Sequence, residues 1–199
     1  MFFEKAGRVW DTLHELERRL GEAGLDYVVI GGLALNAYNY PRQTIDVDIV
    51  LTPADFERFK AQFAGSAYRG LPKLPRRFLD PATDVTIDVL IAGQIAGNAK
   101  KNSSVRFPDP AEAAVHADLR TVSLGRLIEL KLVTWRYKDW GDVVELIRRN
   151  NLPESFAEKL DPIIRSAYGE CWDQANDKEY EEPTGWVQPD AAHKTDRTG

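Results

Sequence analysis

The amino-acid sequence predicts an α/β (α+β) domain, in which strands and helices alternate and further helices follow toward the C-terminus. Runs of β-branched or alternating apolar residues predict strands in two regions, within residues 27–51 and at residues 85–91. Apolar residues at helical spacing occur before these strands, at about 4–23, and after them, from about residue 123 onward. The pattern therefore predicts a sheet that helices cover.

The composition indicates an ordinary globular protein. With 199 residues, of which 43% are hydrophobic, the chain can form a compact domain with a substantial core. The net charge of −5 argues against broad electrostatic wrapping of nucleic acid and leaves room for a local basic patch. A single cysteine, Cys171, excludes an internal disulfide framework and a cysteine-based zinc cluster. No stretch approaches the roughly 20 apolar residues of a membrane span, so we expect a cytoplasmic protein with no membrane partner.

The first predicted elements are an amphipathic helix, a buried strand and a glycine turn. The helix covers about residues 4–23, ends before Gly24, and repeats apolar residues at helical spacing: Val9, Leu13, Leu16 and Leu20. The short apolar run Tyr27 to Ile30 predicts a strand that stops at Gly31-Gly32, and a short helix is expected from Leu33 to Tyr38. The glycine pair alone is most often a tight turn, and its surroundings match neither a P-loop nor a dinucleotide fingerprint.

The strand after Pro41 carries two carboxylates on one face. Alternation directs Asp46 and Asp48 to one side, and it directs the apolar residues to the other: Ile45, Val47, Ile49 and Leu51. Aspartate is depleted in strands, and two like charges about 7 Å apart along a strand repel each other. A divalent cation such as Mg²⁺, which takes carboxylate and phosphate oxygens together, would explain the pair. The alternative is an edge strand whose charges discourage unwanted pairing.

A capped helix and a second acidic strand follow. Thr52 is expected to cap a helix that begins at Pro53, with Asp55 as the acid of the first turn and a buried face of Phe56, Phe59 and Phe63. Residues 65–84 are predicted to be rich in loops, with a short strand at about 77–79 and a small basic group: Lys73, Arg76 and Arg77. The strand at 85–91 is expected beside the first acidic strand and places Asp88 on its polar face.

The second half of the chain is expected to be mainly helical. A linker at 93–104 and a short strand at 119–122 precede a helix that Ser123 caps and that runs to about Thr134. A further helix is predicted over 140–149, with these features at its ends: Asp139 and Asp142 as a capping box, and Asn150 and Asn151 as the stop.

One more helix is expected at about 154–167, and the composition predicts a poorly ordered acidic tail at 176–199. In this division residues 1–175 form one domain, which consists of two parts: a core at about 25–122 and a helical part at about 123–175.

Two basic residues have more than one interpretation. Arg42 precedes the acids, and it either pairs with Asp46 or Asp48 or contacts a phosphate. Lys131 lies on an otherwise apolar helix face. A lysine at such a position ordinarily packs its aliphatic chain against apolar neighbours and extends its ammonium into solvent. No metal-ligand spacing joins the histidines, which are His14, His116 and His193.

The glycine pair, the Asp46-Val47-Asp48 strand about a dozen residues later and the separate Asp88 resemble the nucleotidyltransferase superfamily with the DNA polymerase β-like fold. Within it, two strings are most similar to small bacterial nucleotidyltransferases related to AbiEii-type toxins: GGLALNAYNYPRQTIDVDIV and LIELKLVTWRYKDWGDVVELI. The resemblance covers roughly Tyr27 to Ile147. It implies a mixed β-sheet flanked by helices, an NTP bound through two Mg²⁺ or Mn²⁺ ions, and transfer of the NMP as pyrophosphate leaves.

The resemblance also implies roles for individual residues. Gly31 and Gly32 would hold the triphosphate, with Arg42 and Lys131 as further nucleotide-binding residues. Its metal ligands and catalytic acids would be Asp46, Asp48 and Asp88, of which Asp88 either completes the metal site or helps to deprotonate the acceptor. Lys131 matches the helical lysine that reaches nucleotide phosphates and is counted with the catalytic residues. The late acidic position of the family falls on Asp139 or Asp142.

The function that these features predict is a Mg²⁺-dependent nucleotidyltransferase, which moves an NMP onto a protein, an RNA or a small-molecule acceptor. A role in a toxin–antitoxin or phage-defence pair, with a small protein partner, is compatible with this activity. The alternative is a catalytically inactive module of the same fold that binds a nucleotide or a protein partner. The intact pair of Asp46 and Asp48 disfavours that alternative.

Overall fold

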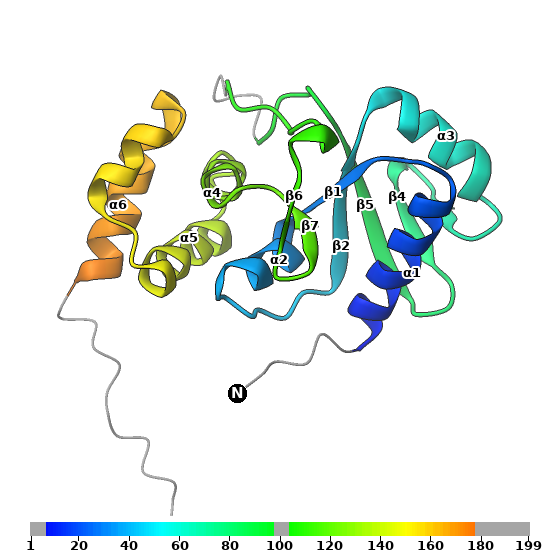
Figure 1. The fold of residues 1–199 in the computed structure, drawn as a ribbon, viewed down its shortest axis with the longest axis horizontal. Coiled ribbons are helices and arrows are strands. Elements are labelled where there is room, and N and C mark those ends of the chain that lie inside the picture. Colours follow the sequence, from blue (N-terminus) through cyan, green and yellow to red (C-terminus); the bar gives the residue numbers. More distant parts are fainter. Residues whose placement is uncertain (1–6, 98–103, 178–199) are drawn as a thin grey trace, which may run out of the picture.

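A computed structural model gives the fold of residues 7–97 and 104–177 (Figure 1). In this part of the chain, the strands are β1 (Tyr27–Ile30), β2 (Asp46–Leu51), β3 (Arg69–Leu71), β4 (Leu74–Asp80), β5 (Val85–Ile91), β6 (Ala114–His116) and β7 (Leu119–Thr121). They form one sheet in the order β3-β4-β5-β2-β1-β7-β6. The pairs β2–β5 and β1–β7 are parallel and the other neighbours are antiparallel. The predicted α/β class with a mixed sheet is therefore confirmed.

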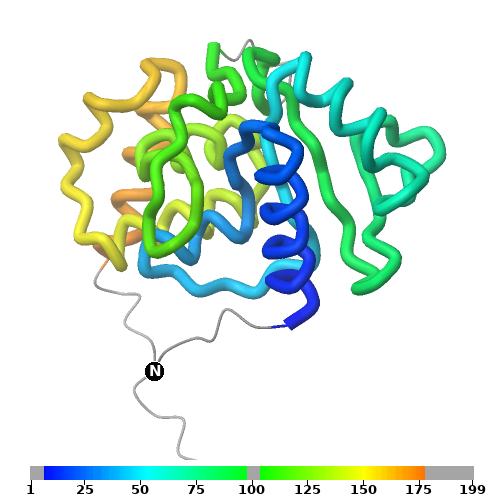
Figure 2. Tube along the Cα trace, turned by 45° about the vertical axis from the view of Figure 1, so that its right-hand side comes forward, coloured from blue at the N-terminus to red at the C-terminus, as the bar shows by residue number. Residues whose placement is uncertain are grey.

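Helices cover both faces of this sheet. They are α1 (Arg8–Glu22), α2 (Gly31–Ala34), α3 (Pro53–Phe63), α4 (Leu124–Leu132), α5 (Tyr137–Asn150) and α6 (Arg165–Asn176). Short 3₁₀ segments lie at Leu35–Tyr38, Pro110–Glu112, Glu154–Lys159 and Pro162–Ile164. The helices α1 and α3 pack on one face, whereas α4 and α5 pack on the other, with α6 against α5 (Figure 1). In the turned view, α6 and α3 lie on opposite sides of the molecule (Figure 2).

The alternation of β2 decides which side of the sheet carries the acids. Val47, Ile49 and Leu51 are fully buried with the leucines of α1 and the phenylalanines of α3. Asp46 and Asp48 therefore project from the opposite face, where Val50 packs into the core formed with α4 and α5. The acids consequently face the space between the sheet and the C-terminal helices.

Several local signals in the sequence produce the elements that they predict. The Thr52 hydroxyl accepts a hydrogen bond from the Asp55 backbone N–H (3.0 Å), and Pro53 opens α3. Ser123 caps α4 in the same way. After α5, Asn151 takes the left-handed conformation that ends many helices.

The strand expected at about 77–79 lies within β4, but the structure corrects the prediction that residues 65–84 are otherwise rich in loops. These residues form the hairpin β3–β4, which continues the sheet beyond β5. Arg69 and Gly70 of β3 are exposed at the sheet edge, so no apolar alternation marks this strand in the sequence. The sequence also gave no sign of β6, another short edge strand. Ile45 was assigned to the acidic strand, but it precedes β2 and is 85% exposed.

The C-terminal helices also differ from the prediction. A helix was expected at about 154–167, but this region holds two 3₁₀ segments and the long helix starts only at Arg165. Pro162 explains the break because it lacks a backbone N–H, and Asp161 caps the segment that follows. In the predicted linker, Ile95 bridges to Arg106, whereas residues 98–103 lie outside the described part.

The predicted tail lies outside the described residues from 178 onward, and the division into a core and a helical part stays a prediction. Within the described residues, none of the helices has the length and apolar character that crossing a membrane requires.

Candidate functional site

Three carboxylates meet on two parallel strands. Asp48 of β2 stands directly beside Asp88 of β5 in the strand register, and Asp46 lies two residues earlier on β2. One carboxylate oxygen from each residue can be chosen so that all three lie within 4.8 Å of one another. The structure therefore brings together the three acids that the sequence suggested as metal ligands.

The three carboxylates differ in their partners. The Thr44 hydroxyl donates to Asp46 (2.7 Å), and Arg77 donates to both oxygens of Asp88. Among residues 7–97 and 104–177, no group donates a hydrogen bond to the Asp48 carboxylate. Burial, followed by the negative charges of Asp46 and Asp88, raises the pKa of Asp48 to about 7. Carboxylate oxygens are the ligands that Mg²⁺ prefers, and Asp48 has no cationic hydrogen-bond partner among the described residues. The cluster therefore fits a divalent cation such as Mg²⁺.

The pKa of Asp48 predicts how stability depends on pH in the metal-free protein. The ordinary pKa of this carboxyl is 3.8 and burial raises it to about 7. Between these values the unfolded chain loses the proton while the folded chain keeps it, so the free energy of unfolding should fall as pH rises through this window. Above pH 7 the full cost, up to about 4 kcal/mol, is present.

Asp48→Asn should remove this pH dependence and stabilise the metal-free protein at neutral pH. Urea unfolding of wild type and Asp48→Asn in chelator, at pH 4.5 and pH 8, measures the difference between the two proteins. If that difference is the same at both pH values, Asp48 does not titrate in this range.

The glycine pair lies directly against the acids. Gly31 has φ +69°, and a Cβ at this position would overlap the Asp48 carboxylate. A Cβ on Gly32 would lie 2.6 Å from the Thr44 hydroxyl oxygen. Both positions therefore require glycine, because Asp48 and Thr44 pack directly against their Cα atoms. This requirement holds whether or not the glycines also bind a phosphate.

Gly31→Ala should consequently destabilise the protein by about 2 kcal/mol or more, through backbone strain and overlap with Asp48. Gly141→Ala is the matched control, because Gly141 lies within α5 with open space around its Cβ position. This second change should stabilise the protein by up to about 1 kcal/mol. Denaturant unfolding of both variants gives the comparison, and equal stability of the two would contradict the steric account of Gly31.

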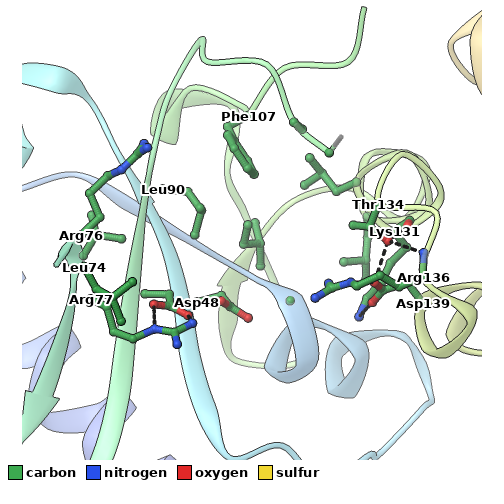
Figure 3. A pocket seen from close by; sticks show the side chains of 18 of the residues that line it. Asp48, Leu74, Arg76, Arg77, Leu90, Phe107, Lys131, Thr134, Arg136 and Asp139 are labelled. Atoms are coloured by element: carbon green, nitrogen blue, oxygen red, sulfur yellow. Dashed lines mark hydrogen bonds and ion pairs between the residues drawn. The ribbon is translucent and has the colours of Figure 1, made fainter. Parts of the chain in front are cut away.

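A cavity of about 530 Å³ opens beside the acids, between the sheet and α4–α5. In Figure 3, Arg76 and Arg77 stand on one side of it and Lys131 and Arg136 on the other, with Asp48 between them. Apolar side chains complete the lining, among them Leu74, Leu90, Phe107, Leu127 and Leu130. Its size and its mixture of charged and apolar walls suit a small organic ligand that carries phosphates.

Lys131 belongs to a buried ion-pair network on the wall opposite the acids. Its side chain is only 7% exposed, and the ammonium donates to Asp142 (2.7 Å) and Asp139 (3.2 Å). The Thr134 hydroxyl (2.7 Å) and Arg136 Nε (2.5 Å) also donate to Asp139. Burial alone would raise the pKa of Asp139, but the Thr134 hydrogen bond and the neighbouring cations lower it overall.

This network corrects two expectations from the sequence. Asp139 and Asp142 were predicted to cap a helix, but α5 begins earlier, with Arg136 at its N-cap position, and both acids lie inside it. Their burial, at 1% and 2% exposure, is instead explained by the cation between them. Lys131 does not carry its ammonium to solvent, because the chain supplies two buried partners for it.

Arg42 also differs from its prediction. It does not pair with Asp46 or Asp48, because its Nη1 donates to Asp142 (2.8 Å), whereas its contact with a phosphate stays a prediction. Arg42 thus ties the loop before β2 to α5 and joins the Lys131 network. It lines a second cavity, of about 560 Å³, together with Lys138.

Sequence reasoning missed the importance of Arg77 and Arg136. In the sequence Arg77 is only one member of a small basic group, because no local pattern predicts the hairpin that sets it opposite Asp88. Arg136 lay in a segment quoted for the family resemblance, but nothing local indicated that it would line the cavity.

Neither a comparison with protein-family models nor one with curated protein sequences gives a match. Two solved structures of ANT(2'')-Ia resemble this chain. A crystal structure in complex with adenylyl-2''-tobramycin has a TM-score of 0.42 and 17% sequence identity, over 83% of this chain and 86% of that chain. A solution structure of this antibiotic-resistance factor has a TM-score of 0.41 and 18% identity, over 82% and 80%. Both TM-scores lie below 0.5.

Proposed function

We propose that this protein is a metal-dependent nucleotidyltransferase, which passes an NMP from an NTP to an acceptor and releases pyrophosphate. One observation carries the proposal: Asp46, Asp48 and Asp88 converge at the edge of a nucleotide-sized cavity whose opposite wall carries Lys131 and Arg136. A carboxylate cluster facing cations across such a cavity suits a ligand with several phosphates and a bound divalent cation.

In this proposal Asp46 and Asp48 hold Mg²⁺ or Mn²⁺, with Asp88 completing the cluster. A divalent cation held there would neutralise phosphate charge that develops during the transfer. Gly31 and Gly32 provide backbone next to these acids, where the triphosphate is expected. Because Lys131 and Arg136 face the same cavity, their positive charges favour binding of the phosphates.

The reaction itself is an in-line displacement at the α-phosphorus. An acceptor hydroxyl oxygen forms a bond to this phosphorus, and the bond to the oxygen that bridges the α- and β-phosphates breaks. Pyrophosphate leaves with the electron pair, and the hydroxyl proton passes to solvent. The chain contributes mainly position and charge, as is usual for transfer at phosphorus.

The apolar part of the cavity supports a nucleoside end for the same ligand. Leu90, Phe107 and Leu127 line the cavity, and in Figure 3 Leu90 and Phe107 lie above Asp48 and Arg77. Backbone hydrogen bonds from Gly93 to Phe107 and from Phe107 to Gln94 (both 2.9 Å) fix the segment that carries the aromatic ring. An aromatic ring in a partly apolar pocket is a suitable contact for a nucleobase.

A second candidate is a module that binds a nucleotide without transferring it. The bidentate ion pair between Arg77 and Asp88 favours this alternative. It occupies both oxygens of the third acid, which are then not free to bind a metal ion or to accept the acceptor's proton. The role in a toxin–antitoxin or phage-defence pair, the relation to AbiEii-type proteins and a small protein partner stay predictions from the sequence resemblance.

Incubation with each α-labelled NTP, Mg²⁺ or Mn²⁺ and a cell extract tests the proposal and separates the two candidates. Label should appear in one fraction, protein, RNA or small molecules, with wild type and not with Asp46→Asn. The fraction identifies the acceptor class. If all four NTPs bind but none transfers label to any fraction, the binding module is the better account.

A further inference from the structure

Arg77 holds the third acid in the geometry that makes the strongest ion pairs. It stands opposite Asp88 in the β4–β5 register, and its Nε and Nη2 donate to the two carboxylate oxygens at 2.6 and 2.5 Å. The side chain of Asp88 is 19% exposed and that of Arg77 43%, so the pair lies at the cavity wall. The preceding residue on β4, Arg76, bonds to Gln94 instead.

Arg77 is the basic residue that forms an ion pair with the cluster of Asp46, Asp48 and Asp88. In the described part of the chain, no other basic side chain bonds to Asp46, Asp48 or Asp88. Lys131 and Arg136 face the cavity, but their hydrogen bonds go to the acids of α5. With all three acids ionised, as when they bind a metal ion, three carboxylates and one guanidinium carry a formal charge of −2, which a single divalent cation neutralises.

We propose that the Arg77 guanidinium neutralises Asp88 and takes the place of a second metal ion in this cluster. The nucleotide-free protein then binds one divalent ion, at Asp46 and Asp48. This inference rests on the metal site of the proposed function and adds the number of ions and the residue that sets it. Arg77 is a positioning residue here, because it acts through Asp88.

The test is Mn²⁺ binding to the full-length, nucleotide-free protein, followed by electron paramagnetic resonance and calorimetry. Wild type should bind one ion at the cluster. Arg77→Met leaves three unpaired carboxylates, so the ion should bind at least about tenfold more tightly. Arg76→Met is the matched control, because it removes the same charge from the neighbouring position without touching Asp88, and its affinity should stay within about threefold of wild type.

Two further variants separate charge from folding defects. Arg77→Met combined with Asp88→Asn restores the charge of −2 and should return the affinity toward the wild-type value. Arg77→Lys keeps the charge and should bind one ion with an affinity near that of wild type. Circular dichroism and urea unfolding confirm that each variant is folded before its ions are counted.

The inference is overturned if wild type binds two Mn²⁺ ions of similar affinity without nucleotide, or if Arg77→Met binds Mn²⁺ no more tightly than Arg76→Met. Either result leaves the nucleotidyltransferase proposal standing, because the cluster still holds metal. Absence of Mn²⁺ binding in wild type and in every variant would instead remove the metal site on which both proposals rest.

Discussion

Asp46→Asn and Asp48→Asn should each lower nucleotidyl transfer by about a thousandfold or more and leave the fold intact. The loss follows because a metal-binding carboxylate supports several kcal/mol of charge stabilisation in the transition state, and about 1.4 kcal/mol corresponds to a factor of ten in rate. The fold should survive because neither carboxylate has a cation partner in the described residues, and amide and carboxylate are nearly the same size. Initial rates with an α-labelled NTP, together with circular dichroism, measure both parts.

The control for this prediction is Asp84→Asn. Asp84 is exposed in the turn between β4 and β5 and has a left-handed φ of +59°, which asparagine also tolerates. This variant loses the same charge outside the cavity and should keep the wild-type rate. Near wild-type transfer by both Asp46→Asn and Asp48→Asn would contradict the metal-dependent mechanism.

Lys131→Met should destabilise the protein by about 3–5 kcal/mol. The family resemblance assigns this lysine to nucleotide phosphates, and the structure adds a role in folding. Removal of the ammonium leaves the buried acids Asp139 and Asp142 without their shared partner. Replacing one member of a buried ion pair is costly because the remaining charge is still out of water.

Urea unfolding of Lys131→Met beside Lys138→Met tests this second prediction. Lys138 is exposed on the first turn of α5, so its replacement removes the same charge and should change stability by less than about 0.5 kcal/mol. Similar stability of the two variants would show that Asp139 and Asp142 do not depend on Lys131. In that case Lys131 would be available to contact phosphate without a cost to the fold.

The sequence identified the acids and the glycine pair because their signals are local. Asp46 and Asp48 alternate with buried residues of one strand, and Gly31 ends the strand before them. Strand alternation also placed Asp88 on the correct face, although its register beside Asp48 needed the structure. These positions follow from a period of two residues and from the rarity of charge in a buried strand.

The partners of these acids could not be predicted, because tertiary contacts decide them. Arg77 reaches Asp88 through an edge hairpin without apolar alternation, and Arg42 crosses to Asp142, 100 residues away. Asp139 and Asp142 fit a capping box in the sequence. In the structure they bind Lys131 instead, because α4 packs against α5 and buries all three side chains. Local propensity was outweighed here by the need to pair buried charge.

The position of the label on the NTP tests the central claim most directly. Wild-type protein should be incubated with Mg²⁺, an acceptor fraction and an NTP labelled in parallel reactions at the α- or the γ-phosphorus. The proposed transfer predicts that the α-label becomes attached to the acceptor while the γ-label leaves as pyrophosphate, and that Asp46→Asn does neither. Attachment of the γ-label to the acceptor, or release of the γ-label as inorganic phosphate with no α-label on any acceptor, would contradict it.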